Sequence, residues 1–183
     1  MIGLLTSLIV FLSFACNSDN SPSHQSTQAV KKDKSELNDD LFDLKFQIEK
    51  MENDLYSLAV TIDLFDGSFI VSPHSQDSVY GHFDIIFKDF GNIVADKTLS
   101  EIPASYPEID PILNTLVRFV RGKTTYKQNI HILTKGDFDA SGMIWFVLEP
   151  SCVPYDVEFR ISSRSGKMTI TKTKTAVSAG YKG

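Results

Sequence analysis

Two histidines and two carboxylates lie within one short stretch, and these residue types bind metal ions or transfer protons. The segment HSQDSVYGHFD contains His74, Asp77, His82 and Asp84. Imidazole nitrogen and carboxylate oxygen are common ligands of zinc and related metals. The spacing of the four residues matches no compact metal site, and histidines in loops are usually solvated. We therefore predict no metal ion here and no cofactor elsewhere.

A second segment, DFDASGMIWFVL at 137–148, resembles the first half of a calcium-binding EF-hand loop. Asp137, Asp139 and Ser141 supply oxygen atoms at alternate positions, and a glycine follows. Such a loop also needs a bidentate glutamate at its last position, which here is Leu148. The residues that follow the glycine are typical of a strand rather than a helix. The segment is therefore predicted to be a polar turn that leads into a strand.

Other signatures of catalysis are equally incomplete. The GKT sequence at 122–124 matches the end of a phosphate-binding loop, but Val117 stands where that loop requires its first glycine. A carboxylate pair such as Glu108 and Asp110 would suit a glycosidase only at a fixed separation, which the sequence does not set. We therefore predict no catalytic residue. A small hydrolase without a recognisable motif remains an alternative.

The N-terminal segment has a different composition from the rest of the chain. Residues 1–15, MIGLLTSLIVFLSFA, contain no charged side chain. As a helix they would extend roughly 22 Å, which is short of a hydrocarbon core of about 30 Å. An apolar run of this length at the start of a chain, ending in small residues, is typical of a secretory signal peptide.

The end of this run, Leu12-Ser13-Phe14-Ala15-Cys16, resembles the lipobox of bacterial lipoproteins. The resemblance implies cleavage before Cys16 and attachment of diacylglycerol to its sulfur. It also implies a bacterial cell envelope location, in the outer membrane if the organism is Gram-negative. Several acyl chains, palmitate among them, hold a protein on a membrane far better than one. The alternative is an ordinary cleaved signal peptide, after which Cys16 keeps its thiol.

Residues 16–40 are predicted to be a disordered tether that follows the lipidated cysteine. Beyond Cys16 they contain only Ala29, Val30 and Leu37 as apolar side chains. So few apolar groups cannot offset the entropy cost of ordering the backbone. If lipid occupies the sulfur of Cys16, then Cys152 has no partner for a disulfide bond within the chain. We predict that Cys152 is buried as a small apolar residue.

The remaining domain, residues 41–183, begins with two segments of alternating polarity. In 41–50 and 55–64 every second side chain is apolar, which is typical of strands with one buried face. A short loop between the two segments predicts an antiparallel hairpin, with Phe46 opposite Leu58.

A second hairpin is predicted near the C-terminus, where residues 155–162 and 167–174 flank a turn at 163–166. One register of this hairpin places Ile161 opposite Met168. Further strands are expected at 68–72, 82–90, 92–99, 124–133 and 143–149. About eight short strands separated by turn residues predict an all-β fold, an antiparallel β-sandwich of immunoglobulin-like type.

Two features of the domain leave alternatives open. The segment 111–121 has the pattern of a short helix with Asp110 as its N-cap, yet 116–121 also alternates like a strand. The strand at 143–149 is apolar on both faces, whereas a sandwich strand needs only one apolar face. We expect the 110–121 segment to cover the second face, the alternative being a partner protein.

Charge is unevenly distributed along the domain. From Arg160 to the C-terminus there are six basic residues and no acidic one, although the whole chain has a net charge of −5. A basic hairpin could bind an anionic polymer, but lysines on an edge strand also prevent aggregation, and we favour this second explanation. No nucleic acid partner is expected.

Together these features predict a lipid-anchored cell-envelope protein that acts by binding rather than by catalysis. An envelope protein or a glycan is the expected partner, in addition to the membrane that holds the anchor. An accessory subunit of an envelope complex, docked through residues 143–147 or the basic hairpin, is the main alternative. The sequence does not define the oligomeric state.

Overall fold

The computed structural model describes residues 41–76, 79–89 and 91–178, and these residues form an all-β domain. The predicted signal peptide, Cys16 and the predicted tether lie outside the described residues. The strands are β1 (Phe42–Glu52), β2 (Leu55–Leu64), β3 (Phe69–Val71), β4 (Asp84–Phe87), β5 (Ile93–Ile102), β6 (Pro107–Ile109), β7 (Leu116–Arg121), β8 (Thr124–Ile132), β9 (Phe138–Leu148), β10 (Val153–Arg164) and β11 (Lys167–Val177).

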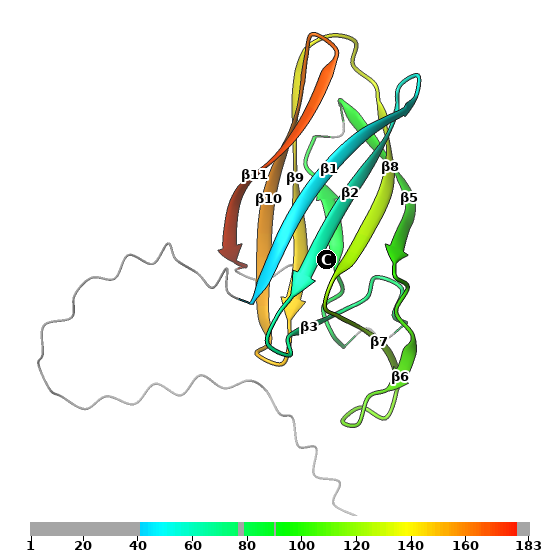
Figure 1. Ribbon diagram of the computed structural model, residues 1–183, viewed down its shortest axis with the longest axis vertical. Helices are drawn as coiled ribbons and strands as arrows, with labels where there is room; N and C mark the ends of the chain where they lie inside the picture. The colour runs from blue at the N-terminus through cyan, green and yellow to red at the C-terminus, as the bar shows by residue number, and fades with distance from the viewer. Residues whose placement is uncertain (1–40, 77–78, 90, 179–183) are drawn as a thin grey trace, which may run out of the picture. The chain divides into compact units, whose positions relative to one another are not determined.

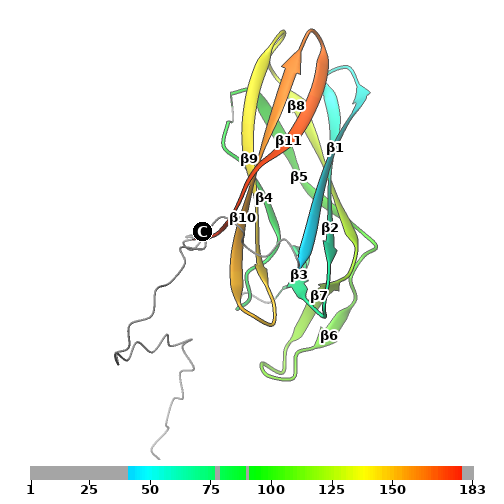
Figure 2. The ribbon, with the colours of Figure 1, turned by 60° about the vertical axis from the view of Figure 1, so that its left-hand side comes forward.

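Two four-stranded antiparallel sheets pack face to face and confirm the predicted β-sandwich (Figure 1). One sheet has the strand order β1-β2-β8-β5, and the other has the order β11-β10-β9-β4. A smaller sheet, β3-β7-β6, lies at one end of the sandwich, as Figure 2 shows from a second direction. The immunoglobulin-like subtype remains a prediction.

The core lies between the two large sheets and follows from the alternation along each strand. Inward side chains of β2 and β9, such as Val60 and Phe146, are fully buried. Phe42 from β1 packs edge-on against Phe146, with ring centroids 5.0 Å apart, and so joins the two sheets. Burial of such rings removes a large apolar area from water and stabilises the sandwich.

The first predicted hairpin is confirmed, but its register was wrong by two residues. Phe46 lies opposite Val60 rather than Leu58. The strands continue further than expected, so that only Asn53 and Asp54 form the turn, and Asn53 adopts a positive φ of 44°. A shift of two residues keeps every side chain on its predicted face, because side chains alternate with a period of two.

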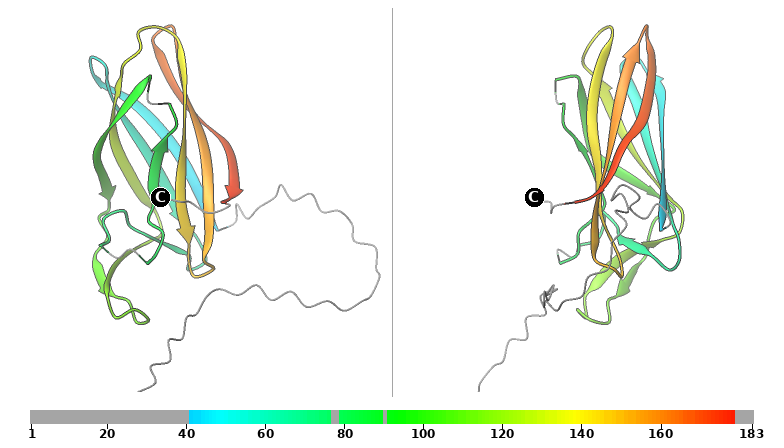
Figure 3. Two further views of the ribbon diagram at one scale, coloured as in Figure 1. Left: turned by 180° about the vertical axis from the view of Figure 1, so that it is seen from behind. Right: turned by 90° about the vertical axis from the view of Figure 1, so that its left-hand side faces the viewer.

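The C-terminal hairpin differs from the prediction in the same way. Ile161 lies opposite Ile170 rather than Met168. Its turn has only two residues, Ser165 and Gly166, both with positive φ, at 50° and 77°. Such turns match the natural twist of paired strands and therefore displace longer loops. Strand β11 forms the edge of its sheet, which agrees with the edge-strand interpretation of its lysines (Figure 3).

Of the two alternatives left open for 111–121, the helix is wrong, because this region is turn and strand. Residues 116–121 form β7, which pairs with β3 on one side and with β6 on the other. Asp110 does cap backbone N–H groups, but they are those of Ile112 and Leu113 in a turn, at 2.8 and 2.7 Å. The alternating side chains of β7 bury Val117 against the small sheet, and this tertiary packing outweighs the local helix signal.

The EF-hand-like segment is not the polar turn that was predicted, because β9 already begins at Phe138 and includes Asp139, Ser141 and Gly142. Only Asp137 precedes the strand. Asp137 accepts a hydrogen bond from the Ser165 backbone, at 2.8 Å. Asp139 forms an ion pair with Arg164, at 2.6 Å. These acidic side chains therefore stabilise the neighbouring β10–β11 turn.

Candidate ligand groove

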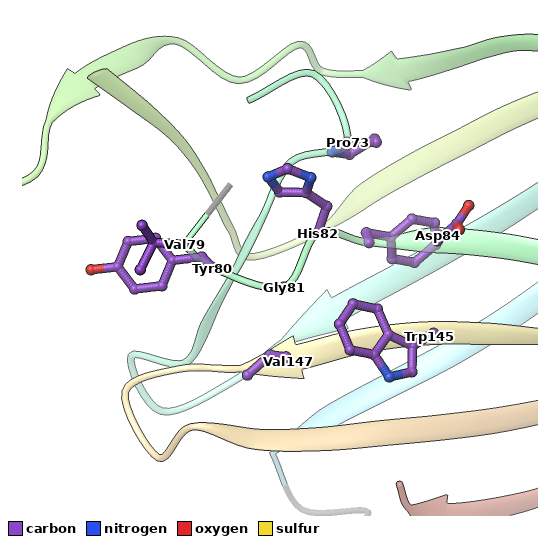
Figure 4. Close-up of a pocket in the computed structure, with 9 residues that line it drawn as sticks. Pro73, Val79, Tyr80, Gly81, His82, Asp84, Trp145 and Val147 are labelled. Atoms are coloured by element: carbon purple, nitrogen blue, oxygen red, sulfur yellow. The ribbon is translucent and has the colours of Figure 1, made fainter. Parts of the chain in front are cut away.

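An open groove of about 630 Å³ lies on the outer face of the β4–β9 pair. Its floor is formed by Trp145 and Val147, which point outward from β9 (Figure 4). Its walls come from the segment 79–84 and from Pro73. The groove therefore occupies the outer apolar face of β9, for which the sequence had predicted a cover.

The cover is the segment 79–83, and the prediction that 110–121 would supply it was wrong. Gly81 lies against the floor so closely that an added Cβ would be 2.5 Å from Trp145 Cη2 and 2.5 Å from Val147 Cγ2. Only a glycine lets the backbone approach this near without displacing the indole. The cover is partial, because Trp145 and Val147 remain half-buried and line the groove.

Both ends of this covering segment are fixed to the body of the domain. The Phe83 backbone N–H donates to the Val71 carbonyl at 3.0 Å. The ring of Phe83 stacks on Tyr126, with centroids 3.9 Å apart. At the other end the Tyr80 hydroxyl donates to Asp110 Oδ2 at 3.0 Å. These contacts hold the groove open in a defined shape.

Carboxylates lie on both sides of the indole. Asp84 on β4 and Asp156 on β10 are the residues directly opposite Trp145 in the two antiparallel ladders. Directly opposite residues share one face of a sheet and have adjacent side chains. Burial raises the pKa of Asp84, and the Ile85 backbone N–H and nearby His82 partly oppose this shift. The groove thus combines an aromatic surface with an acidic flank.

The structure brings together only two of the four histidine and aspartate residues considered above. His82 and Asp84 both line the groove. His74 lines a separate hollow beside Arg118, and Asp77 lies outside the described residues. Within 41–76, 79–89 and 91–178, no group of three or more histidine, cysteine or acidic residues is arranged to hold a metal ion.

The other acidic candidates have structural contacts. Glu108 forms an ion pair with Arg121, at 2.5 Å. Asp110 caps its turn and accepts the Tyr80 hydroxyl, and these hydrogen bonds hold its pKa below the ordinary value. Each of the two carboxylates is therefore engaged with its own neighbours.

Cys152 is exposed, and the prediction that it would be buried was wrong. It lies in the turn between β9 and β10 with a positive φ of 53°. Its thiol donates to Glu149 Oε2, at 3.3 Å. Its place in this short turn leaves the side chain exposed, which apolar character alone did not indicate.

Sequence reasoning did not assign the covering role of Tyr80 and Gly81. The sequence signal for this cover was a glycine between aromatic residues, together with a strand elsewhere in the chain whose second apolar face needed covering. The covering contact depends on the tertiary path of the chain after β3, and no local pattern encodes that path.

No helix in the described part of the chain is long and apolar enough to span a membrane. The chain matches no family model, and no similar protein was found among curated proteins or among solved structures.

Proposed function

We propose that this protein is lipid-anchored in a bacterial cell envelope through Cys16, and that its β-sandwich binds a ligand without catalysing a reaction. The ligand binds in the groove over Trp145. Its chemistry is a positively charged amine or quaternary ammonium group next to apolar surface, as on a partner's lysine side chain or an amine-bearing glycan.

The observation that carries this proposal is the position of Trp145 between Asp84 and Asp156. An indole face attracts cations through its quadrupole, and nearby carboxylates add a direct electrostatic attraction. Asp156 Oδ1 is shielded from solvent and accepts no hydrogen bond from the residues that the structure describes. A cation in the groove would lie beside Asp84, which lines it, with Asp156 on the other side of Trp145.

Binding is favoured over hydrolysis by the lining of the groove. Its described titratable side chains are Tyr80, His82 and Asp84. The Tyr80 hydroxyl is already donated to Asp110. Nucleophilic catalysis needs a nucleophile, a base and a group that orients the base within hydrogen-bond reach of one another. The fixed aromatic floor instead suits a surface that must keep its shape for a ligand.

The alternative role, an accessory subunit docked through residues 143–147, is disfavoured by the position of Gly81. Its backbone already lies against Trp145 and Val147. A protein partner that used this face would have to displace a segment that is fixed at Tyr80 and Phe83.

The proposal can be tested by fluorescence, because Trp145 is the only tryptophan in the chain. The detergent-solubilised full chain is titrated with choline and, in parallel, with 3,3-dimethylbutan-1-ol, its uncharged analogue of the same shape. We expect choline to change the Trp145 emission in a saturable manner and the alcohol to bind about fivefold or more weakly, as the loss of a cation–π contact implies.

A matched pair of variants locates the charge. Asp84→Asn is expected to weaken choline binding, whereas Asp66→Asn, which removes an equivalent charge from the exposed β2–β3 turn, leaves it unchanged. Equal binding of choline and its neutral analogue, or no saturable change with either, would contradict the proposed ligand chemistry.

A further inference from the structure

The hairpin of β6 and β7 exposes several large apolar side chains at its tip. Ile109 is 66% exposed, Ile112 83% and Leu116 61%. These three residues are called the apolar tip below. Soluble proteins rarely leave so many large apolar groups together in water unless the surface contacts a membrane or a partner.

The apolar tip presents almost no charge to solvent. From Ile109 to Val117 the only charged residue is Asp110, which is 4% exposed. Its carboxylate is turned inward, where it accepts hydrogen bonds from Tyr80 and from two backbone N–H groups. Insertion of this tip into an apolar phase would therefore desolvate no exposed charge within that segment, which removes the main cost of entry.

The guanidinium and carboxylate groups at the base of the hairpin are also engaged. Arg118 donates to the Ser105 carbonyl. Glu108 and Arg121 form an ion pair with each other. Charged groups near the tip thus stabilise the hairpin.

The apolar tip lies at the same end of the sandwich as Leu41, the first described residue (Figure 1). The Leu41 carbonyl accepts a hydrogen bond from the backbone N–H of Phe65. The residue before Phe65, Leu64, donates its backbone N–H to the carbonyl of Gly122, which directly follows β7. From Gly122, the six residues of β7 extend roughly 20 Å towards the tip, at the usual rise of a strand. Figure 1 shows the β6–β7 hairpin at the opposite end from the β1–β2 turn, and Figures 2 and 3 agree.

We propose that the apolar tip inserts into the surface of the lipid bilayer that carries the N-terminal anchor. The location of this bilayer rests on the proposed lipidation of Cys16. The proposed anchor precedes Leu41 in the chain, and Leu41 lies at the end of the sandwich that bears the tip (Figure 1), so we expect this end to face the membrane. Once one attachment holds a protein at a membrane, a second, weak apolar contact binds at high effective concentration.

The test imposes the anchor chemically, so that a negative result cannot arise from a failure of cells to lipidate the protein. The full chain with Cys152→Ser keeps Cys16 as its single cysteine, which is coupled to a maleimide lipid in phosphatidylcholine vesicles. Trp145→Phe removes the native tryptophan, and Ile112→Trp then places a single reporter in the apolar tip. A matched chain carries Met51→Trp instead, at the opposite end of the sandwich. Leu116→Trp serves as a second tip reporter should the first variant fold poorly.

Quenching by lipids with brominated acyl chains measures insertion. We expect the emission of the reporter at residue 112 to be roughly halved, with no change for the reporter at residue 51. Equal and negligible quenching of both reporters would overturn the proposal. Protection of the tip reporter from iodide without quenching by brominated lipid would also overturn it, and would assign the tip to a second copy of the chain or to another protein.

Discussion

Gly81 lies against Trp145 at a distance that excludes any side chain, since a Cβ on Gly81 would be 2.5 Å from the indole Cη2. The segment that carries Gly81 is fixed at Tyr80 and at Phe83, so it cannot move away freely. This relationship joins the β3–β4 connection to the outer face of β9. It sets both the shape of the groove and the partial exposure of the indole.

Gly81→Ala is therefore expected to destabilise the domain by about 1–3 kcal/mol, the usual cost of overpacking. The covering segment should lift, and the Trp145 emission should shift to longer wavelength as water reaches the indole. Thermal unfolding and the emission maximum measure the two effects. Gly91→Ala is the matched control, because a Cβ there meets nothing within 4 Å. Equal unfolding temperatures for the two variants would show that the segment is loosely held.

Gly142→Ala should act inside the core by the same mechanism. A Cβ on Gly142 would lie 2.2 Å from Cζ of Phe159, its cross-strand neighbour on β10. We expect a loss of about 1–3 kcal/mol in the free energy of unfolding, because a buried ring has little room to shift. Adding Phe159→Leu should recover part of this loss. Additive losses in the double variant would contradict the assigned contact.

Glu101 should make the stability of the domain depend on pH. This side chain is 8% exposed and accepts a hydrogen bond from the Ser105 backbone N–H at 2.6 Å. Burial alone would raise the pKa of Glu101, but the polar groups of Ser105, Ser72 and Tyr126 around the carboxylate hold this pKa below its ordinary value. A lowered folded-state pKa stabilises the protein above the ordinary glutamate value, near 4.3, and this contribution is lost as pH falls through the folded-state pKa.

Urea unfolding of wild type and Glu101→Gln at pH 7 and near pH 3 measures this contribution. At pH 7 the variant should lose about 1.5–3 kcal/mol, the usual value for hydrogen bonds to a charged group. Near pH 3 the difference between the two proteins should shrink. A constant difference across this range would show that the ionised carboxylate of Glu101 is not the stabilising species.

Cys152 should react with a thiol reagent while the domain is folded. Its side chain is exposed in the β9–β10 turn, so access does not require unfolding. With Cys16→Ser, the reaction with dithionitrobenzoate should proceed at a similar rate in the native protein and in urea. Reaction that occurs only in urea would contradict the exposed position.

Regular alternation made the hairpins predictable from sequence, since it fixes which side chains face the core. Their register was not predictable to better than two residues, because Asn53 and Ser165 adopt positive φ and close shorter turns than the flanking residues suggested. A shift by two conserves both faces, so the predicted core still agrees with the buried residues.

Tertiary contacts decided the remaining elements. Asp110 followed by proline is a strong helix start signal, yet β7 gains pairing with two strands and buries Val117, which a surface helix would not achieve. The groove likewise depends on Gly81 meeting Trp145, two residues far apart in the chain. The sequence indicated that the outer face of β9 needed a cover, but its local patterns did not indicate which segment supplies it.

The most direct test of a lipid-anchored binding domain is mass spectrometry of the protein extracted from the membranes of cells that produce it. The account predicts an N-terminal peptide that begins at Cys16 and carries diacylglycerol on its sulfur, and it predicts that Cys16→Ser abolishes this product. A mature chain that begins elsewhere, or one whose Cys16 carries an unmodified thiol, would contradict the account.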